Sequence, residues 1–116
     1  PEASPTVRSN PDVVKAVLSL KDGDQAGRAL YFTRSTLFGD GPIWRHIGIY
    51  GYRIDALRAF NAAPPSPLEQ REGLEQLRGL ELGLSYWAAI AEAAPISVDN
   101  PSDLDTARAY AESLEP

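Results

Sequence analysis

One stretch of the chain alternates apolar or small residues with side chains that can exchange hydrogen bonds. It reads His46-Ile47-Gly48-Ile49-Tyr50-Gly51-Tyr52-Arg53. A period of two predicts a β-strand with distinct faces, one of which carries His46, Tyr50 and Tyr52. Imidazole and phenol groups both donate and accept hydrogen bonds, so this face could bind a ligand that carries many hydroxyl groups. An aromatic face packed beneath a helix is the structural alternative.

A second segment with candidate binding groups is Leu74-Glu75-Gln76-Leu77-Arg78. It falls inside a helix that we predict from residue 67 to Gly83, because Ser66-Pro67-Leu68-Glu69 is a capping box with proline at the first helical position. A carboxylate accepts hydrogen bonds from two hydroxyl groups, and an amide both donates and accepts. Glu75 and Gln76 could therefore recognise a polyol, and a solvated helix face is the alternative for both.

Composition limits the classes of partner. The 116 residues fit one domain with a modest core. Sixteen acidic and 11 basic residues give a net charge of -5, which argues against broad binding to nucleic acid or to an anionic membrane surface. No apolar run approaches the roughly 20 residues that cross a bilayer, and no charged region leads into an apolar one at the start, so we expect no targeting segment. The absence of Cys is typical of a reducing compartment, so we expect a cytoplasmic protein.

The remaining pattern predicts the element order β-β-β-α-α-β-α. Residues 1–11 are rich in Pro, Ser and charge and read as an extended leading segment, with the folded part at 12–116. Strands are predicted over residues 13–20 and 28–34, around turn residues at 21–24, and over the alternating stretch that starts at His46. Helices follow at 55–60 and from 67, then a strand over 84–91, for which a helix is the alternative, and a last helix from Pro101. We find no Gly-rich phosphate-binding loop.

Five blocks, in order, carry a resemblance to a known family. They are Asn10-Pro11 with Val14-Lys15, Ala29-Leu30-Tyr31-Phe32-Thr33-Arg34, the stretch from His46 to Arg53, residues 65–78, and Val98-Asp99-Asn100-Pro101. Together they resemble the second half of the 3-deoxy-manno-octulosonate cytidylyltransferases, also called CMP-Kdo synthetases. The resemblance implies an α/β chain, namely the C-terminal part of a nucleotide-diphospho-sugar transferase-like three-layer fold, which binds the sugar and dimerises.

The resemblance also implies a reaction and partners. Enzymes of this family use CTP and Mg²⁺ to attach CMP to the anomeric hydroxyl of 3-deoxy-D-manno-octulosonate (Kdo), releasing pyrophosphate, for lipopolysaccharide biosynthesis. We accordingly expect CTP and Kdo as substrates, a homodimer, and an N-terminal half that binds CTP and is needed for activity. The fragment alone should be inactive, because transfer needs the α-phosphate of CTP held in line with the sugar oxygen.

Three residues of the first blocks match positions that the family uses for the sugar. Arg34 is expected to bind the Kdo carboxylate, which a planar guanidinium can meet with two parallel hydrogen bonds. A solvated arginine, or one paired with Asp40, is the alternative. His46 and Tyr50 are expected to hydrogen-bond the hydroxyl and carboxylate groups of Kdo.

Three further residues match positions in the later blocks. Glu75 and Gln76 are expected to recognise sugar hydroxyls. Asp99 is expected to be one of two carboxylates that hold Mg²⁺, a hard cation that prefers oxygen ligands, and a turn residue is the alternative. The resemblance predicts that Arg34, His46 and Gln76 converge on one cavity.

Two alternatives stay open at this point. The loop at residues 35–45 is shorter than the family's, so an 8-amino analogue of Kdo is an alternative substrate. A non-catalytic remnant that dimerises or binds a sugar acid is an alternative function.

Overall fold

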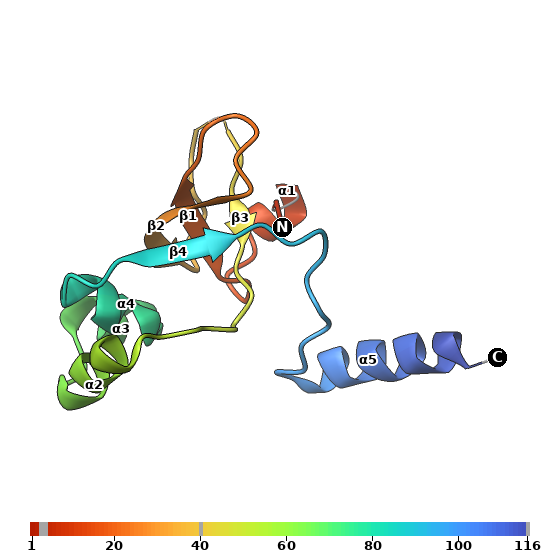
Figure 1. Ribbon diagram of the computed structural model, residues 1–116. Coiled ribbons are helices and arrows are strands. Elements are labelled where there is room, and N and C mark those ends of the chain that lie inside the picture. Colours follow the sequence, from red (N-terminus) through yellow and green to blue (C-terminus); the bar gives the residue numbers. More distant parts are fainter. Residues whose placement is uncertain (3–4, 40, 116) are drawn as a thin grey trace.

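One antiparallel sheet organises the chain. The computed structural model describes residues 1–2, 5–39 and 41–115. The strands are β1 (Lys15–Ser19), β2 (Ala26–Thr33), β3 (Trp44–Arg45) and β4 (Tyr86–Ala89), in the sheet order β3-β1-β2-β4 (Figure 1). The helices of the described residues are α1 (Pro5–Arg8), α2 (Ile54–Ala62), α3 (Pro67–Glu72), α4 (Gln76–Glu81) and α5 (Pro101–Leu114). The α/β class is confirmed, with one more helix at the start and one predicted helix divided in two.

The hairpin of β1 and β2 forms the centre of the sheet. The strands predicted over 13–20 and 28–34 are confirmed, and Lys15 pairs with Thr33 in their antiparallel register. At the turn, the Lys21 backbone N–H donates to a carboxylate oxygen of Asp24 at 3.0 Å, and the Asp24 N–H donates back to the Lys21 carbonyl at 3.0 Å. Gly23 takes the positive φ of +85° that side chains disfavour, so local chemistry closes this turn.

The third strand is much shorter than the alternation predicts. β3 pairs with β1 only through Trp44 and Arg45, and the His46 N–H then donates to the Val14 carbonyl at 3.0 Å. Beyond His46 the backbone leaves the sheet, so the predicted strand over residues 46–52 is wrong. Gly48 and Gly51 weaken strand formation, and the Ile49 N–H turns back to the Ile47 carbonyl at 2.8 Å.

The helix predicted from residue 67 to Gly83 is two helices. The capping box is confirmed, because Ser66 Oγ accepts from the Glu69 N–H at 3.3 Å and Glu69 Oε2 accepts from the Ser66 N–H at 3.0 Å. Gly73 then takes the left-handed conformation (φ 68°, ψ 32°) and ends α3. Because α4 restarts at Gln76, the direction of its side chains is set separately from that of α3.

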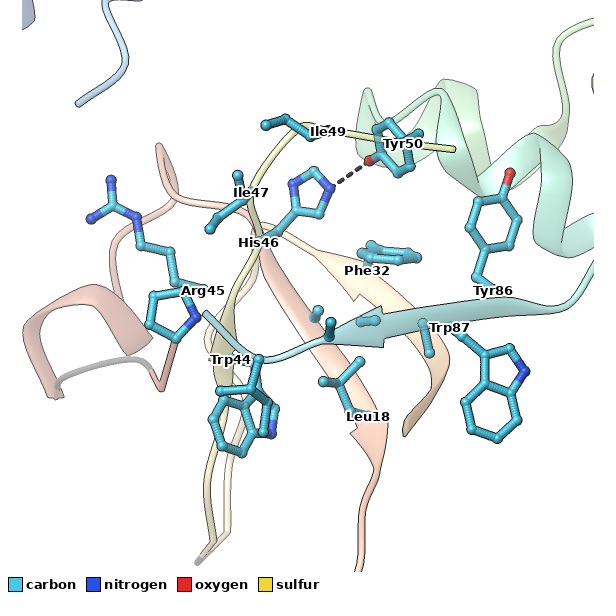
Figure 2. A pocket seen from close by; sticks show the side chains of 16 residues that line it. Leu18, Phe32, Trp44, Arg45, His46, Ile47, Ile49, Tyr50, Tyr86 and Trp87 are labelled. Atoms are coloured by element: carbon cyan, nitrogen blue, oxygen red, sulfur yellow. Dashed lines mark hydrogen bonds between the residues drawn. The ribbon is translucent and has the colours of Figure 1, made fainter. Parts of the chain in front are cut away.

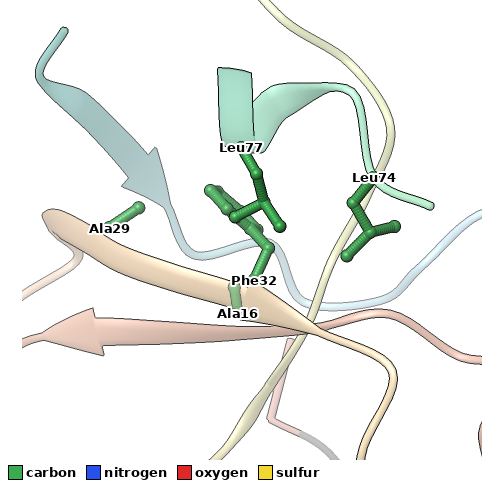
Figure 3. Close-up of a cluster of buried hydrophobic side chains, with 5 residues drawn as sticks. All are labelled: Ala16, Ala29, Phe32, Leu74 and Leu77. Carbon is green, nitrogen blue, oxygen red and sulfur yellow. The ribbon is translucent and has the colours of Figure 1, made fainter. Parts of the chain in front are cut away.

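A small core joins α4 to the sheet. The sheet contributes Ala16, Ala29 and Phe32 to this core. They pack against Leu74 and Leu77, which come from the helical side (Figure 3). The Leu77 side chain is 0% exposed, so it anchors α4 and its neighbour Gln76 on β1 and β2.

Both ends of the chain hold helices outside this core. The leading segment, expected to be extended, contains the single turn α1, and Arg8 Nη2 donates to the Gly41 carbonyl at 2.6 Å. The last helix is confirmed, since the Asn100 side chain caps α5 by accepting from the Asp103 N–H at 2.9 Å. It lies apart from the sheet at the end of an extended segment (Figure 1). In the described part of the chain, no helix combines the length and apolar character needed to cross a membrane.

Candidate functional site

His46 and Tyr50 form a hydrogen-bonded pair. The Tyr50 hydroxyl and His46 Nε2 lie 2.5 Å apart (Figure 2). Burial lowers the pKa of His46 because desolvation disfavours the charged imidazolium. In its neutral form, with the proton on Nδ1, the ring can accept a hydrogen bond from the phenol at Nε2. Burial also raises the pKa of the Tyr50 phenol, with smaller contributions from Tyr52 and from the negative charge of Glu75.

The pair stands at the edge of an apolar cavity. Its volume is about 290 Å³, and much of its wall is aliphatic or aromatic, including Leu18, Phe32, Trp44, Ile47, Tyr86 and Trp87 (Figure 2). The edge of Phe32 meets the His46 ring at a centroid distance of 5.4 Å and an interplanar angle of 78°. The aromatic wall of the cavity therefore packs against the imidazole ring.

A larger hollow lies on the other side of His46. It has a volume of about 1160 Å³. Its lining includes Arg34 and Arg45 from the strand ends, Asp99 just before α5, and Asp103 in the first turn of α5. Ligand sites of drug-sized molecules commonly enclose about 300–1,000 Å³, so the hollow is large enough for a small molecule. Three predicted site residues, Arg34, His46 and Asp99, thus border one hollow.

Arg34 follows β2 directly and is half-buried. Its Nη1 makes a long contact of 3.4 Å to the Asp12 carbonyl, which leaves further guanidinium donors for a ligand. Asp40, the alternative partner, lies outside the described residues.

Lys15 supports Arg34 and was not foreseen as a site residue. Its side chain is 0% exposed, and Nζ donates to the carbonyls of Asn10, at 2.9 Å, and Arg34. Burial and the positive charge of Arg34 lower the pKa of Lys15. The ammonium thereby ties the leading segment to the strand end that carries Arg34. A lysine within an apolar strand run was the available signal.

Glu75 and Gln76 take different environments at the start of α4. Glu75 is exposed, and it lies near enough to Tyr50 for its charge to raise the pKa of the phenol. Gln76 is 8% exposed and its Nε2 has no hydrogen-bond partner among the described residues. Gln76 lines neither hollow, so the structure brings Arg34 and His46 together but not Gln76. The anchoring of Leu77 in the core draws its neighbour inward.

Asp99 lies on the exposed segment before α5. Its backbone N–H donates to Asp103 Oδ2 at 3.1 Å, so the Asp103 carboxylate is held against the backbone at Asp99. Oxygen donors of this kind suit Mg²⁺. Within the described ranges, however, no three or more His, Cys, Asp or Glu side chains are placed to hold a metal ion. With Asp99, the described residues alone thus offer too few such side chains in one place for a metal site.

The sequence of this chain is similar to those of known proteins. No protein-family model matches the chain. It is 57% identical over 103 residues to the 3-deoxy-manno-octulosonate cytidylyltransferase of Parvibaculum lavamentivorans, which covers 88% of this chain and 40% of the relative. The enzyme of that name from Rhodospirillum centenum is 52% identical over the same shares. By sequence the chain is homologous to a part of the CMP-Kdo synthetases.

A solved structure agrees with this homology. The fold matches that of CMP:2-keto-3-deoxy-manno-octonic acid synthetase, solved in complex with CTP, with a TM-score of 0.77 and 33% sequence identity. The match covers 97% of this chain and 46% of the solved one. The chain therefore spans about 40% of the length of its curated CMP-Kdo synthetase relatives.

Proposed function

We propose that this chain is the sugar-acid-binding part of an enzyme that transfers CMP from CTP to Kdo and releases pyrophosphate, for lipopolysaccharide biosynthesis. The observation that supports it most is the hollow shared by Arg34, His46 and Asp99, in a chain 57% identical to a curated cytidylyltransferase. Arg34 binds the sugar carboxylate through two parallel hydrogen bonds. His46 and Tyr50 exchange hydrogen bonds with hydroxyl groups.

The proposal assigns Glu75 and Gln76 to sugar hydroxyl groups that extend beyond the hollow of Arg34, His46 and Asp99, which Gln76 does not line. The unpartnered Nε2 of Gln76 supports it, because a buried donor without an acceptor costs free energy that a hydroxyl oxygen would recover. Glu75 stays exposed beside Tyr50 and can accept from hydroxyl groups.

The reaction needs groups that this chain lacks. Asp99 would provide one carboxylate to Mg²⁺, which when bound offsets negative charge on the triphosphate. The other carboxylate and the CTP-binding surface belong to an N-terminal half, so the chain alone does not turn over. A homodimer in the cytoplasm completes the proposal.

A chimera tests it. This chain is joined to the remaining N-terminal part of the Parvibaculum lavamentivorans relative, and pyrophosphate release is measured with CTP, Mg²⁺ and either Kdo or its 8-amino analogue. We expect release that depends on the sugar. Arg34→Gln should raise KM for the sugar by about 10-fold or more, because hydrogen bonds to a charged group contribute about 1.5–3 kcal/mol.

The matched control is Arg28→Gln, an exposed arginine of β2, the strand that Arg34 follows, and it should leave KM unchanged. A folded chimera that binds Kdo without releasing pyrophosphate would contradict the enzyme and favour a non-catalytic remnant. A lower KM for the 8-amino analogue than for Kdo would show that the analogue is the preferred substrate.

A further inference from the structure

The segment that carries Tyr50 lacks support from the sheet. After the bond of the His46 N–H to Val14, the described backbone from residue 47 to 52 makes no pairing with a strand, and its one internal bond joins Ile49 to Ile47. The position of the Tyr50 hydroxyl on His46 Nε2 must therefore depend on side-chain packing.

Tyr86 of β4 provides that packing. Its ring stands perpendicular to Tyr50 (centroids 6.5 Å apart, 90°) and to Tyr52 (5.8 Å, 88°), and its hydroxyl lies 2.8 Å from that of Tyr52. The same ring meets Phe32 edge-on at 6.3 Å, and Phe32 in turn supports the His46 ring (Figure 2). Tyr86 thus contacts Tyr50 directly and His46 through one intermediate ring.

Gly79 of α4 makes room for Tyr86. A Cβ atom at this position would lie 2.0 Å from the Tyr86 hydroxyl oxygen and 2.7 Å from both Cε2 and Cζ of the ring. These distances are far below van der Waals contact, so any side chain would displace the phenol. Glycine is unfavourable inside a helix, and the ring against the α4 backbone explains why it stands here.

We propose that Tyr86, seated against Gly79, is a positioning residue that holds Tyr50 on His46 for sugar binding. The inference rests on the proposed function of that pair. Tyr86 acts through Tyr50, Tyr52 and Phe32 and needs no contact with the ligand. Its loss should loosen the hydrogen bond between Tyr50 and His46, and so weaken sugar binding more than turnover.

Substitutions at both positions separate positioning from packing. Gly79→Ala should lower Tm, and Gly79→Ala combined with Tyr86→Leu should recover most of that loss, because leucine leaves space for the new methyl group. The double variant still lacks the aromatic edge and the hydroxyl. We therefore expect it to fold, to shift the ¹⁵N resonance of His46 Nε2, and to raise KM for Kdo about 10-fold in the chimera with a smaller change in kcat.

The imidazole signal is unambiguous because His46 is the only histidine of the chain. Tyr86→Phe, which keeps the ring and removes the bond to the Tyr52 hydroxyl, should give a smaller shift. Tyr110→Leu on α5, an exposed aromatic residue, is the control and should change neither readout.

Two outcomes decide between the proposals. A double variant that keeps the wild-type Nε2 resonance and KM would overturn the positioning role and leave Tyr86 as packing alone. An unsubstituted chimera that folds but shows no sugar-dependent turnover would count against the proposed function. The Nε2 resonance of this chain still tests the positioning of His46 in that case, because it requires no ligand.

Discussion

Arg78 donates from Nε and Nη2 to both carboxylate oxygens of Glu69, at 2.8 and 2.7 Å. The ion pair ties α4 to the first turn of α3, where Glu69 also serves the capping box with Ser66. The Arg78 guanidinium further lies 4.8 Å from the centroid of the Phe60 ring on α2. Arg78 therefore holds three helices together, although it belongs to the same sequence block as the candidate sugar ligands.

This ion pair predicts acid sensitivity. The hydrogen bonds from Arg78 lower the pKa of the Glu69 carboxyl in the folded chain. The ion pair therefore stabilises the fold at every pH above the pKa that Glu69 has in the unfolded chain. This contribution is lost as pH falls through the lower pKa that Glu69 has in the folded chain. Arg78→Met should lower Tm by several degrees at pH 7 and narrow its difference from the unsubstituted chain at pH 3. Thermal unfolding followed by circular dichroism measures both. Parallel curves of Tm against pH would contradict the assignment.

His46 predicts a second dependence on pH. Burial lowers its pKa, so the neutral ring stabilises the fold above the unfolded value of about 6.5, and this contribution is lost as pH falls through the folded pKa. NMR titration of the Hε1 proton should give a midpoint below 6.5 in the folded chain. The urea-unfolded chain is the reference and should titrate near 6.5. A folded midpoint at or above the reference would disprove the burial.

Leu77 should dominate the stability of the core. Its side chain is fully buried against β1 and β2, so Leu77→Ala should cost about 2–5 kcal/mol by lost transfer free energy and the cavity left behind. Leu114→Ala on α5, where the leucine is 65% exposed, should change stability by less than about 0.5 kcal/mol. Urea unfolding measures both variants. Equal losses of unfolding free energy in the two variants would show that burial of Leu77 in the core does not dominate the stability.

Gly73 should be required for the break between α3 and α4. Gly73→Ala meets no atom within 4 Å, so its cost of about 1–2 kcal/mol comes from forcing a side chain into the left-handed region at φ 68°. Gly51→Ala is the matched control, since it also meets open space and its φ is not positive. Urea unfolding should separate the two variants. A neutral Gly73→Ala would mean that the helices can join.

The parts of the fold that could be predicted are those held by neighbours in sequence. Three examples are the capping of α3 by Ser66, the capping of α5 by Asn100 and the turn closed by Asp24. Each uses groups that lie within four residues of one another. The alternation that predicted a third strand failed, because a strand needs a partner and the backbone beyond His46 has none. Pairing depends on distant residues, which an alternating pattern does not name.

The same distinction between local sequence and tertiary contacts holds for the candidate site. Residue types, with the family resemblance, indicated Arg34, His46, Tyr50 and Asp99 as binding groups. Tertiary packing alone decided that Gln76 is buried outside both hollows, that Lys15 fixes the backbone of Arg34, and that Tyr86 occupies the space Gly79 leaves. Each of these depends on which surfaces meet across the sheet, and so on contacts between residues far apart in the chain.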